Sequence, residues 1–202
     1  MLEGSAVCKP DLITYSTMIK GYCKEKNIEA ALVVLDTMQH NQIKPDEVLY
    51  NSLLDGCCKA NQIELAFKVY QNMQSAQIKP SNVTYSILVK IYSKKRDLEG
   101  AMSLLDEMRV QRVKPGLIVY TCLIQTLIAA EQIERAEHLF REMTCEPDAV
   151  IFATLIKGQL RAQRFNECLS TAVRMCQTQP ESSQRSDPYQ EVLLKFTNCR
   201  WP

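Results

Sequence analysis

The chain has 202 residues, of which 46% are hydrophobic and 23% charged. This balance is typical of a soluble folded protein, and the length suits one domain with a single core. Its 24 basic and 23 acidic residues give a net charge of +1, which excludes a strong overall field toward nucleic acid or membrane. The longest uncharged apolar-rich run, residues 117–130, is too short to cross a bilayer, which takes about 20 residues. Residues 1–11 lack the pattern of a signal peptide, so no targeting segment is visible.

Nine cysteines are present, but their spacing indicates neither a metal site nor a disulfide framework. The number is odd, no two cysteines form a C-x-x-C pair, and the chain has only two histidines, so a finger-type zinc site is not indicated. Cys23, Cys58, Cys122 and Cys168 fall within apolar helical patterns. We therefore expect buried, reduced thiols, a reducing compartment, and no metal or other cofactor.

A pattern with a period of 35 residues runs through most of the chain. Four residue types recur at this step: Tyr15, Tyr50, Tyr85 and Tyr120; Ala31, Ala66, Ala101 and Ala136; Met38, Met73, Met108 and Met143; and Pro10, Pro45, Pro80 and Pro115. Such self-similarity indicates a repeat protein. It divides the chain into windows 12–46, 47–81, 82–116, a shorter 117–148 and a partial 149–176. The shortening falls between Met143 and Pro147, where we expect it to trim a loop and leave the packed positions unchanged.

Each window has the pattern of two helices. In the first window their apolar residues are Tyr15, Met18, Ile19 and Tyr22, then Ala31, Leu32, Leu35 and Met38. Lys-Pro-Asp at 44–46 ends the second helix, because proline moves the preceding residue out of helical geometry. Gly21, Gly56 and Gly158 share one place in the first helix and predict close packing there, since glycine costs a helix about 1 kcal/mol relative to alanine. The sequence thus predicts an all-α fold, a right-handed α-solenoid of antiparallel helix-turn-helix repeats.

Three segments lie outside the windows. Residues 1–11 are expected to be the end of a truncated preceding repeat, and residues 177–186 a polar linker. Within residues 187–202, Asp-Pro suits the start of a helix. The apolar side of this helix comprises Val192, Leu193 and Phe196. We expect the helix to cap the last repeat.

Three motifs carry a family resemblance. V-T-Y-S-I-L-V at Val83–Val89, A-M-S-L-L-D-E-M at Ala101–Met108 and I-K-P-D at Ile43–Asp46 resemble the pentatricopeptide repeat, a helical hairpin of 35 residues. The resemblance covers Leu12–Cys176. The tetratricopeptide repeat is the alternative, but its period is about 34 residues and its W-x₂-L-G-x₂-Y motif needs a tryptophan. The single tryptophan of this chain is Trp201, outside the windows.

The resemblance implies binding of single-stranded RNA with one base per repeat. In the family, the fifth and the final residues of a repeat face the base edge; here they are Ser16 with Asp46, Asn51 with Ser81, Ser86 with Gly116, and Thr121 with Asp148. The second residues hold the base by its faces, a contact that stiff β-branched side chains suit; here they are Ile13, Val48, Val83, Ile118 and Val150. The alternative is that both sets are ordinary helix caps and hydrophobic staples.

The family's pairing preferences imply a footprint of roughly G-C-N-G. The first and fourth of these pairs imply guanine, and the second implies a pyrimidine, with cytosine preferred. The third pair leaves its base unassigned, because Gly116 has no side chain. In the fifth window, Ala153 stands at the fifth place and cannot hydrogen-bond a base edge.

Although the net charge is close to zero, positive and negative charges are unevenly divided between the helices. The first fourteen residues of the windows together carry +5, and the second-helix stretches carry −5. The thirteenth residue is basic in four of five windows, at Lys24, Lys59, Lys94 and Arg161. In the family this place meets the RNA backbone; the alternative is a basic side chain that complements the helix dipole.

No catalytic motif is present: there is no P-loop, no G-x-S-x-G, and no H-x-E followed by C-x-x-C. The acidic residues on second helices are expected to be solvated surface, as at Asp106, Glu107, Glu134 and Glu137. We therefore expect no enzyme activity. We also expect neither a membrane nor a small molecule as a partner.

Two functions follow as expectations. The resemblance implies a single-stranded RNA-binding module in a mitochondrion or plastid, acting in RNA processing, stability or translation. The alternative is a protein-interaction scaffold or a ribosome-associated subunit, with a larger ribonucleoprotein or ribosomal assembly as partner. Polar residues at the fifth and final places favour RNA, because a peptide groove has no need of them there.

Overall fold

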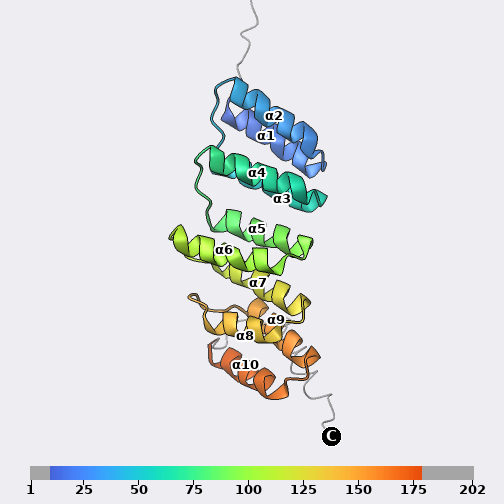
Figure 1. The fold of residues 1–202 in the computed structure, drawn as a ribbon, viewed down its shortest axis with the longest axis vertical. Coiled ribbons are helices and arrows are strands. Elements are labelled where there is room, and N and C mark those ends of the chain that lie inside the picture. The colour runs from blue at the N-terminus through green and yellow to red at the C-terminus, as the bar shows by residue number, and fades with distance from the viewer. Residues whose placement is uncertain (1–9, 179–202) are drawn as a thin grey trace, which may run out of the picture. The chain divides into compact units, whose positions relative to one another are not determined.

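The computed structural model describes residues 10–178, which form ten α-helices and no strand (Figure 1). The first helices of the windows are α1 (Leu12–Lys24), α3 (Glu47–Ala60), α5 (Asn82–Lys95), α7 (Leu117–Ala129) and α9 (Ala149–Arg161). The second helices are α2 (Ile28–His40), α4 (Ile63–Ser75), α6 (Leu98–Val110), α8 (Ile133–Arg141) and α10 (Phe165–Thr178). Each first helix begins at the first residue of its window.

The residue before a first helix acts as its N-cap. Asp11, Asp46 and Asp148 each accept a hydrogen bond at 2.8–2.9 Å from the backbone N–H three residues on. Ser81 caps α5 by accepting from the Val83 N–H at 3.2 Å. The first N–H groups of a helix have no partner inside it, so these side chains fix where the helix starts.

Left-handed residues end eight of the described helices. They have φ of 56–60° and follow the first helices at Lys26, Asn61, Arg96, Glu131 and Gln163, and second helices at Gln42, Gln77 and Arg112. After α1, the Asn27 N–H donates to the Tyr22 carbonyl and the Lys26 N–H to the Cys23 carbonyl, and the same two bonds recur at the other seven ends. This pairing is the Schellman motif, which turns the chain sharply and gives the windows similar turns.

The chain divides into two compact units, Met1–Leu104 and Leu105–Pro202. In the first unit α1 packs on α2 and α3, and α3 packs on α4 and α5; in the second unit α7 packs on α8 and α9, and α9 packs on α10. The prediction of a single core is therefore wrong. Its physical reason is the repeat itself, since each repeat contacts only the repeats next to it and the buried residues are distributed along the chain.

The recurring residues are buried, as predicted for packing positions. Tyr50, Ala66 and Met73 are fully buried. A Cβ atom added at Gly56 would lie 2.6 Å from Cys23 Sγ, so glycine there permits a close approach. Gly158 is similarly enclosed, but at Gly21 nothing lies within 4 Å of an added Cβ. The prediction of close packing is therefore confirmed at two of the three glycines, and Gly21 faces away from the described helices.

The four thiols predicted to be buried are Cys23, Cys58, Cys122 and Cys168, and all are buried and free. Burial raises the pKa of the Cys23 thiol to about 11, with a further contribution from the nearby Asp55 carboxylate. Burial also raises the pKa of Cys57 to about 12. Such thiols stay protonated near neutral pH and are poor nucleophiles, so they act as apolar packing groups.

The shortened window departs from its prediction. Helix α8 has 9 residues, whereas α2, α4 and α6 have 13 each. Met143 falls after the helix and is only half-buried, while Met38, Met73 and Met108 are fully buried. The deletion therefore removes helical turns as well as loop, because the chain must still reach the cap of α9 at Asp148.

Most of the flanking segments lie outside the described residues. The expected end of a preceding repeat at 1–11 is described only at Pro10 and Asp11, and the expected cap at 187–202 is not described. The expected linker at 177–186 begins too early, because α10 continues to Thr178. The rest of that linker lies outside the described residues.

Candidate functional site

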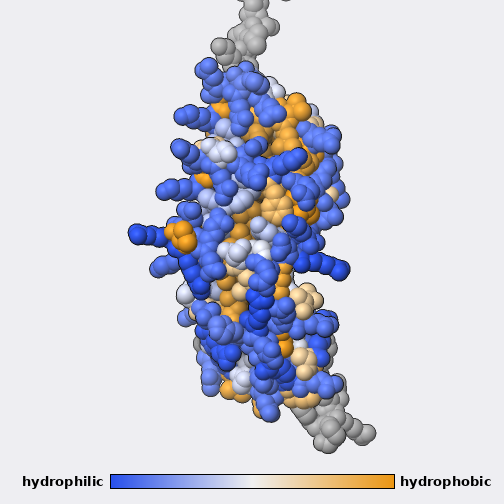
Figure 2. Space-filling model, in the orientation of Figure 1, coloured by the Kyte–Doolittle hydropathy of each residue, from blue (hydrophilic) through white to orange (hydrophobic). Residues whose placement is uncertain are grey.

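Five apolar side chains on the first helices are exposed to solvent. The second residue of each window, here called position 2, is 52–73% exposed at Ile13, Val48, Val83, Ile118 and Val150. The neighbouring Leu49 and Tyr50 are fully buried, so the exposure belongs to one side of the helix. On the face drawn in Figure 2, the surface is mainly hydrophilic and carries apolar patches. Single exposed apolar residues are normal, but five at the same place indicate a contact surface.

Charged residues continue from position 2 along the same side of each first helix. Positions 9 and 13 follow at spacings of seven and four residues, which keep one helix face. Position 9 holds Lys20, Asp55, Lys90, Gln125 and Lys157, and position 13 holds Lys24, Lys59, Lys94, Ala129 and Arg161. None of these ten residues is buried. We call positions 2, 9 and 13 together the first-helix stripe.

The lysines at position 9 were not predicted from the sequence. Position 13 was predicted from the resemblance, whereas Lys20, Lys90 and Lys157 carry no such signal. The available signal was their spacing, because an exposed residue at position 2 implies exposure seven residues later on the same helix. The stripe is therefore more basic than position 13 alone indicates.

In the first unit the stripe borders a cavity of about 320 Å³. Residues of α1, of α3 and of the turn after α1 line it: Lys20, Cys23, Lys24, Lys26, Ser52, Asp55, Gly56 and Lys59. Four lysines thus surround one carboxylate and one hydroxyl. This balance favours an anionic group, such as a phosphate, over a cation.

Two position-13 lysines have protein partners. Lys59 Nζ lies 2.6 Å from a carboxylate oxygen of Asp55, and this hydrogen bond and ion pair raise the pKa of Lys59. Lys94 Nζ donates to the carbonyl of Cys58 near the end of α3. The Lys94 contact agrees with the helix-dipole alternative, although it reaches the neighbouring helix instead of its own. A phosphate would have to compete with these partners.

The structure brings one predicted base-edge pair together. The Thr84 hydroxyl donates to Asn51 Oδ1 at 2.8 Å and accepts from the Ser81 N–H at 3.2 Å. Asn51 Nδ2 also donates to Glu47 at 3.1 Å. Thr84 therefore links the Asn51 side chain to the backbone of Ser81, whose own hydroxyl accepts from the Val83 N–H. One N–H and one lone pair of the Asn51 amide remain for a further partner.

The other predicted base-edge residues are engaged locally. Asp46 and Asp148 each use one carboxylate oxygen as an N-cap, as the helix-cap alternative predicts, and leave the second oxygen. Ser86 is 6% exposed and donates to the Val83 carbonyl, and Thr121 donates to that of Leu117. Ser16 is half-buried, and Gly116 precedes α7 without a side-chain cap. Their contact with a base stays a prediction.

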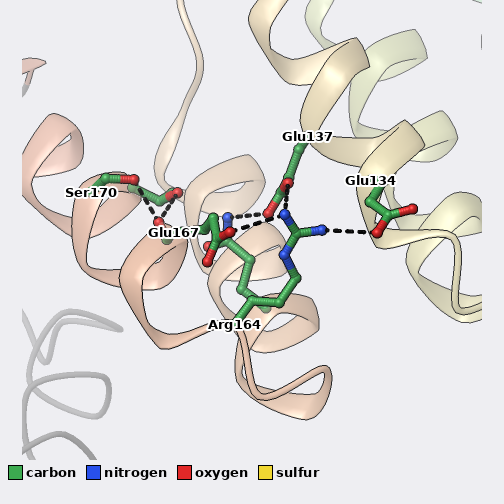
Figure 3. Close-up of polar contacts among 7 residues, drawn as sticks. Glu134, Glu137, Arg164, Glu167 and Ser170 are labelled. Atoms are coloured by element: carbon green, nitrogen blue, oxygen red, sulfur yellow. Dashed lines mark hydrogen bonds and ion pairs between the residues drawn. The ribbon is translucent and has the colours of Figure 1, made fainter.

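A separate polar cluster in the second unit joins α8 to α10 (Figure 3). The Arg164 guanidinium lies 3.2 Å from Glu137, 3.0 Å from Glu167 and 3.4 Å from Glu134. Glu137 also accepts from the buried Gln159 amide at 2.9 Å. The prediction that Glu137 is solvated surface is wrong, because its side chain is only 12% exposed. The carboxylate can be largely buried since the Arg164 guanidinium lies beside it.

The charges in this cluster stabilise one another. A backbone hydrogen bond and the Arg164 guanidinium lower the pKa of Glu167 below its usual 4.5. A carboxyl with a lowered pKa stabilises the fold above that pKa, and this contribution is lost as the pH falls through it. The charged groups of the cluster contact one another and connect α8 to α10, so we assign the cluster a structural role.

Family models match most of the described chain. Those described as PPR repeat match residues 8–39 and 83–113, one described as PPR repeat family matches 45–94, and one described as pentatricopeptide repeat domain matches 103–159. The chain belongs to the pentatricopeptide repeat family. No curated protein matches it by sequence.

Solved structures of pentatricopeptide repeat proteins share the fold. The repeat domain of protein-only RNase P 1 from Arabidopsis thaliana, in complex with tRNA, is 17% identical with a TM-score of 0.74, covering 92% of this chain and 98% of that one. Maize PPR10 is 21% identical with a TM-score of 0.75, covering 88% of this chain and 26% of that one. The chain thus spans about a quarter of the maize protein. The predicted all-α helical-repeat solenoid is confirmed.

Among residues 10–178 no helix is long and apolar enough to span a membrane. Within the same residues, no three His, Cys, Asp or Glu side chains are grouped so as to hold a metal ion.

Proposed function

We propose that the chain binds single-stranded RNA along the first-helix stripe, with position-2 side chains of consecutive windows holding a base by its two faces. The observation that carries this proposal is the exposure of all five position-2 residues. A stiff apolar side chain can press on any base, because every base has an apolar face. Membership of the pentatricopeptide repeat family supports an RNA-binding role, and three of the similar structures contain RNA, one with the repeat domain of RNase P 1 and two with PPR10.

The lysines of the stripe are proposed to contact the phosphates. They lie on the same helix side as position 2, so one strand can meet both. Lys20, Lys24 and Lys26 share a cavity in the first unit and supply positive charge although the whole chain is nearly neutral. Neutralising phosphates releases counterions, which makes the affinity depend on salt.

The fifth and final residues are proposed to select the base. At Thr121 the hydroxyl hydrogen is already donated, so its oxygen can only accept, and the second oxygen of Asp148 can also only accept. Guanine offers two donors on its pairing edge, so this pair suits guanine. Asn51 keeps one donor and one acceptor, which suits the mixed edge of cytosine.

The proposed setting is an organelle. Family resemblance supports a mitochondrion or plastid, and a part in RNA processing, stability or translation. We propose binding as the role of this chain and assign no catalytic step to it.

The test is binding of short single-stranded RNAs by fluorescence anisotropy. Val48→Ser with Val83→Ser should weaken every RNA about 10-fold or more, since fully burying one valine side chain contributes about 1.5–3 kcal/mol and both contacts with the base are lost. Val33 provides the matched control, because it is 64% exposed on the second helix α2. Val33→Ser should leave binding unchanged. An affinity unaffected by the double variant, or absent at low salt in the parent, would refute the proposal and favour a protein-interaction scaffold.

A further inference from the structure

Asn51 differs from the other paired fifth residues because it carries an amide. The others carry hydroxyls: Ser16, Ser86 and Thr121. A hydroxyl donates and accepts at one oxygen, whereas an amide donates from its nitrogen and accepts at its oxygen. A half-turn of the amide about its last side-chain bond exchanges these two atoms. The orientation of the Asn51 amide therefore decides which hydrogen-bonding group meets which part of a base.

Two neighbouring side chains hold the Asn51 amide in one orientation. Its Nδ2 donates to Glu47 Oε1 at 3.1 Å, and its Oδ1 accepts from the Thr84 hydroxyl at 2.8 Å. The Thr84 oxygen also lies 3.5 Å from the same Glu47 oxygen, so the three side chains form a closed triangle. A carboxylate can only accept, so a flipped amide would place its own oxygen against the Glu47 oxygen. The triangle therefore disfavours the flipped amide.

The two partners of Asn51 are unusual for their places in the repeat. Thr84 is a third residue, and the third residues of the second, fourth and fifth windows are apolar and 0–1% exposed: Leu49, Val119 and Ile151. Thr84 is also fully buried, and burying a hydroxyl costs free energy unless the hydroxyl is hydrogen-bonded. Glu47 is a first residue, and the other four windows begin with no acidic residue. The amide and both of its partners thus come together only at the junction of the second and third windows.

Capping of α5 accounts for only part of this arrangement. The Thr84 oxygen accepts from the Ser81 N–H at 3.2 Å, which is one of the two bonds of a capping box. That bond needs only an acceptor, and glutamate or glutamine is the usual residue at this place. It uses neither the hydroxyl hydrogen of Thr84 nor the side chain of Asn51. The bond from Thr84 to Asn51 therefore needs another explanation.

Cytosine and uracil differ in the order of the groups that an amide would meet. Cytosine presents an amino donor beside a ring-nitrogen acceptor, and uracil presents a carbonyl acceptor beside a ring N–H donor. An amide that can flip pairs with both bases, whereas an amide held in one orientation pairs with one of them. We propose that Glu47 and Thr84 are positioning residues that hold the Asn51 amide so that the second window binds cytosine in preference to uracil. This role rests on the proposed RNA binding.

Fluorescence anisotropy of the full chain with two short single-stranded RNAs tests this role. One RNA contains the footprint G-C-N-G with one fixed base at N, and the other has uracil in place of the cytosine. The parent should prefer cytosine about 10-fold or more, the effect of one good bidentate contact. Glu47→Gln accepts either amide orientation and should reduce the preference to about twofold or less. Thr84→Val leaves Asn51 Oδ1 without its donor and should reduce the preference at least about threefold.

Two control variants separate positioning from a purely structural role. Thr84→Ser keeps the hydroxyl and should keep the preference for cytosine. Glu64→Gln removes the same charge from the first turn of α4 in the same window, where the glutamate is exposed, and should also keep the preference. A purely structural loss would weaken the binding of both RNAs alike and leave the ratio of their affinities unchanged.

The outcomes distinguish the positioning role from the proposed function. A parent that binds both RNAs equally or prefers uracil overturns the positioning role and leaves RNA binding standing. The same follows if Glu47→Gln or Thr84→Val keeps the preference of the parent. A parent that binds neither RNA at low salt refutes the proposed function, and the positioning role falls with it. Circular dichroism checks the fold of each variant, and if Thr84→Val does not fold, Glu47→Gln decides the result.

Discussion

Gly21, Gly56 and Gly158 allow one substitution to be compared at three equivalent sites. Changing a helical glycine to alanine stabilises a helix by about 1 kcal/mol when the added methyl meets nothing. That condition holds at Gly21. At Gly56 an added Cβ would lie 2.6 Å from Cys23 Sγ and 2.8 Å from Cys23 Cβ, and at Gly158 it would lie 2.8 Å from Ile133 Cδ1 and 3.0 Å from Ile128 Cδ1. Real Cβ contacts are essentially never shorter than 3.0 Å, so the contacting atoms must shift. At Gly158 these atoms belong to flexible isoleucine side chains, whereas at Gly56 they include Cys23 Cβ, which is fixed to the backbone of α1.

The expected change in the free energy of unfolding on substitution by alanine differs between the three sites. Overpacking costs about 1–3 kcal/mol, so Gly56→Ala and Gly158→Ala should be neutral to about 2 kcal/mol destabilising after the helix gain is subtracted. Gly21→Ala should stabilise by about 0.5–1 kcal/mol. Denaturant unfolding at low protein concentration measures all three against the parent. Equal effects at the three sites would refute the reasoning, because they would mean that packing between windows does not select glycine.

Three further predictions concern the stripe and the polar cluster. Asn51→Thr with Ser81→Asp copies the fourth pair into the second window and should shift preference at one base from cytosine toward guanine by about 1–3 kcal/mol, measured on four RNAs that differ only there. Lys20→Ala with Lys24→Ala should weaken all RNAs alike and reduce the log–log salt slope by about 1.4, at about 0.7 per phosphate contact; an unchanged slope would contradict the phosphate assignment. Arg164→Met should lower the midpoint of chemical denaturation at pH 7, because it removes the cation that pairs with Glu134, Glu137 and Glu167, and an unchanged midpoint would mean that the ion pairs of the cluster contribute nothing.

The helix starts were predictable because two independent signals coincide at each of them. The 35-residue period places the windows, and an aspartate or serine stands at the N-cap of α1, α3, α5 and α9. An N-cap side chain accepts a hydrogen bond from a backbone N–H no more than three residues away, so this interaction can be recognised in the sequence. At α7 the cap is Gly116, and there the period alone placed the helix start.

The helix ends were less predictable. The left-handed residues that close them are Lys, Asn, Arg, Glu or Gln, with no glycine among the eight. Each bears a steric cost of about 1–2 kcal/mol relative to the right-handed form, which the packing of the hairpin overcomes. Sequence signals for such turns rest on glycine or asparagine. Tertiary packing therefore decides these positions.

The residues of the candidate site also differ in how well the sequence predicts them. Position 2 could be named from the resemblance, but its exposure in all five windows, on which the proposed RNA contact rests, comes from the structure. Position 9 was missed because its residues vary from Lys20 to Asp55 to Gln125 and give no repeated letter. Periodicity reveals residues that packing conserves within the chain. It does not reveal residues that differ from one window to the next.

The junction between the fourth and fifth windows shows how the array accommodates a change in one repeat. The shortened α8 leaves Met143 half-buried, so an apolar contact present in three earlier windows is weakened. At the same junction, Glu137 and Gln159 stand at the places where Phe67 and Tyr92 stack in the first unit. Arg164 stands at the place before a second helix where Asn27 caps α2, and its guanidinium joins α8 to α10. Charged hydrogen bonds thus connect the helices where the apolar contact is reduced, and because each window touches only its neighbours, this local replacement leaves the packing of distant windows unaffected.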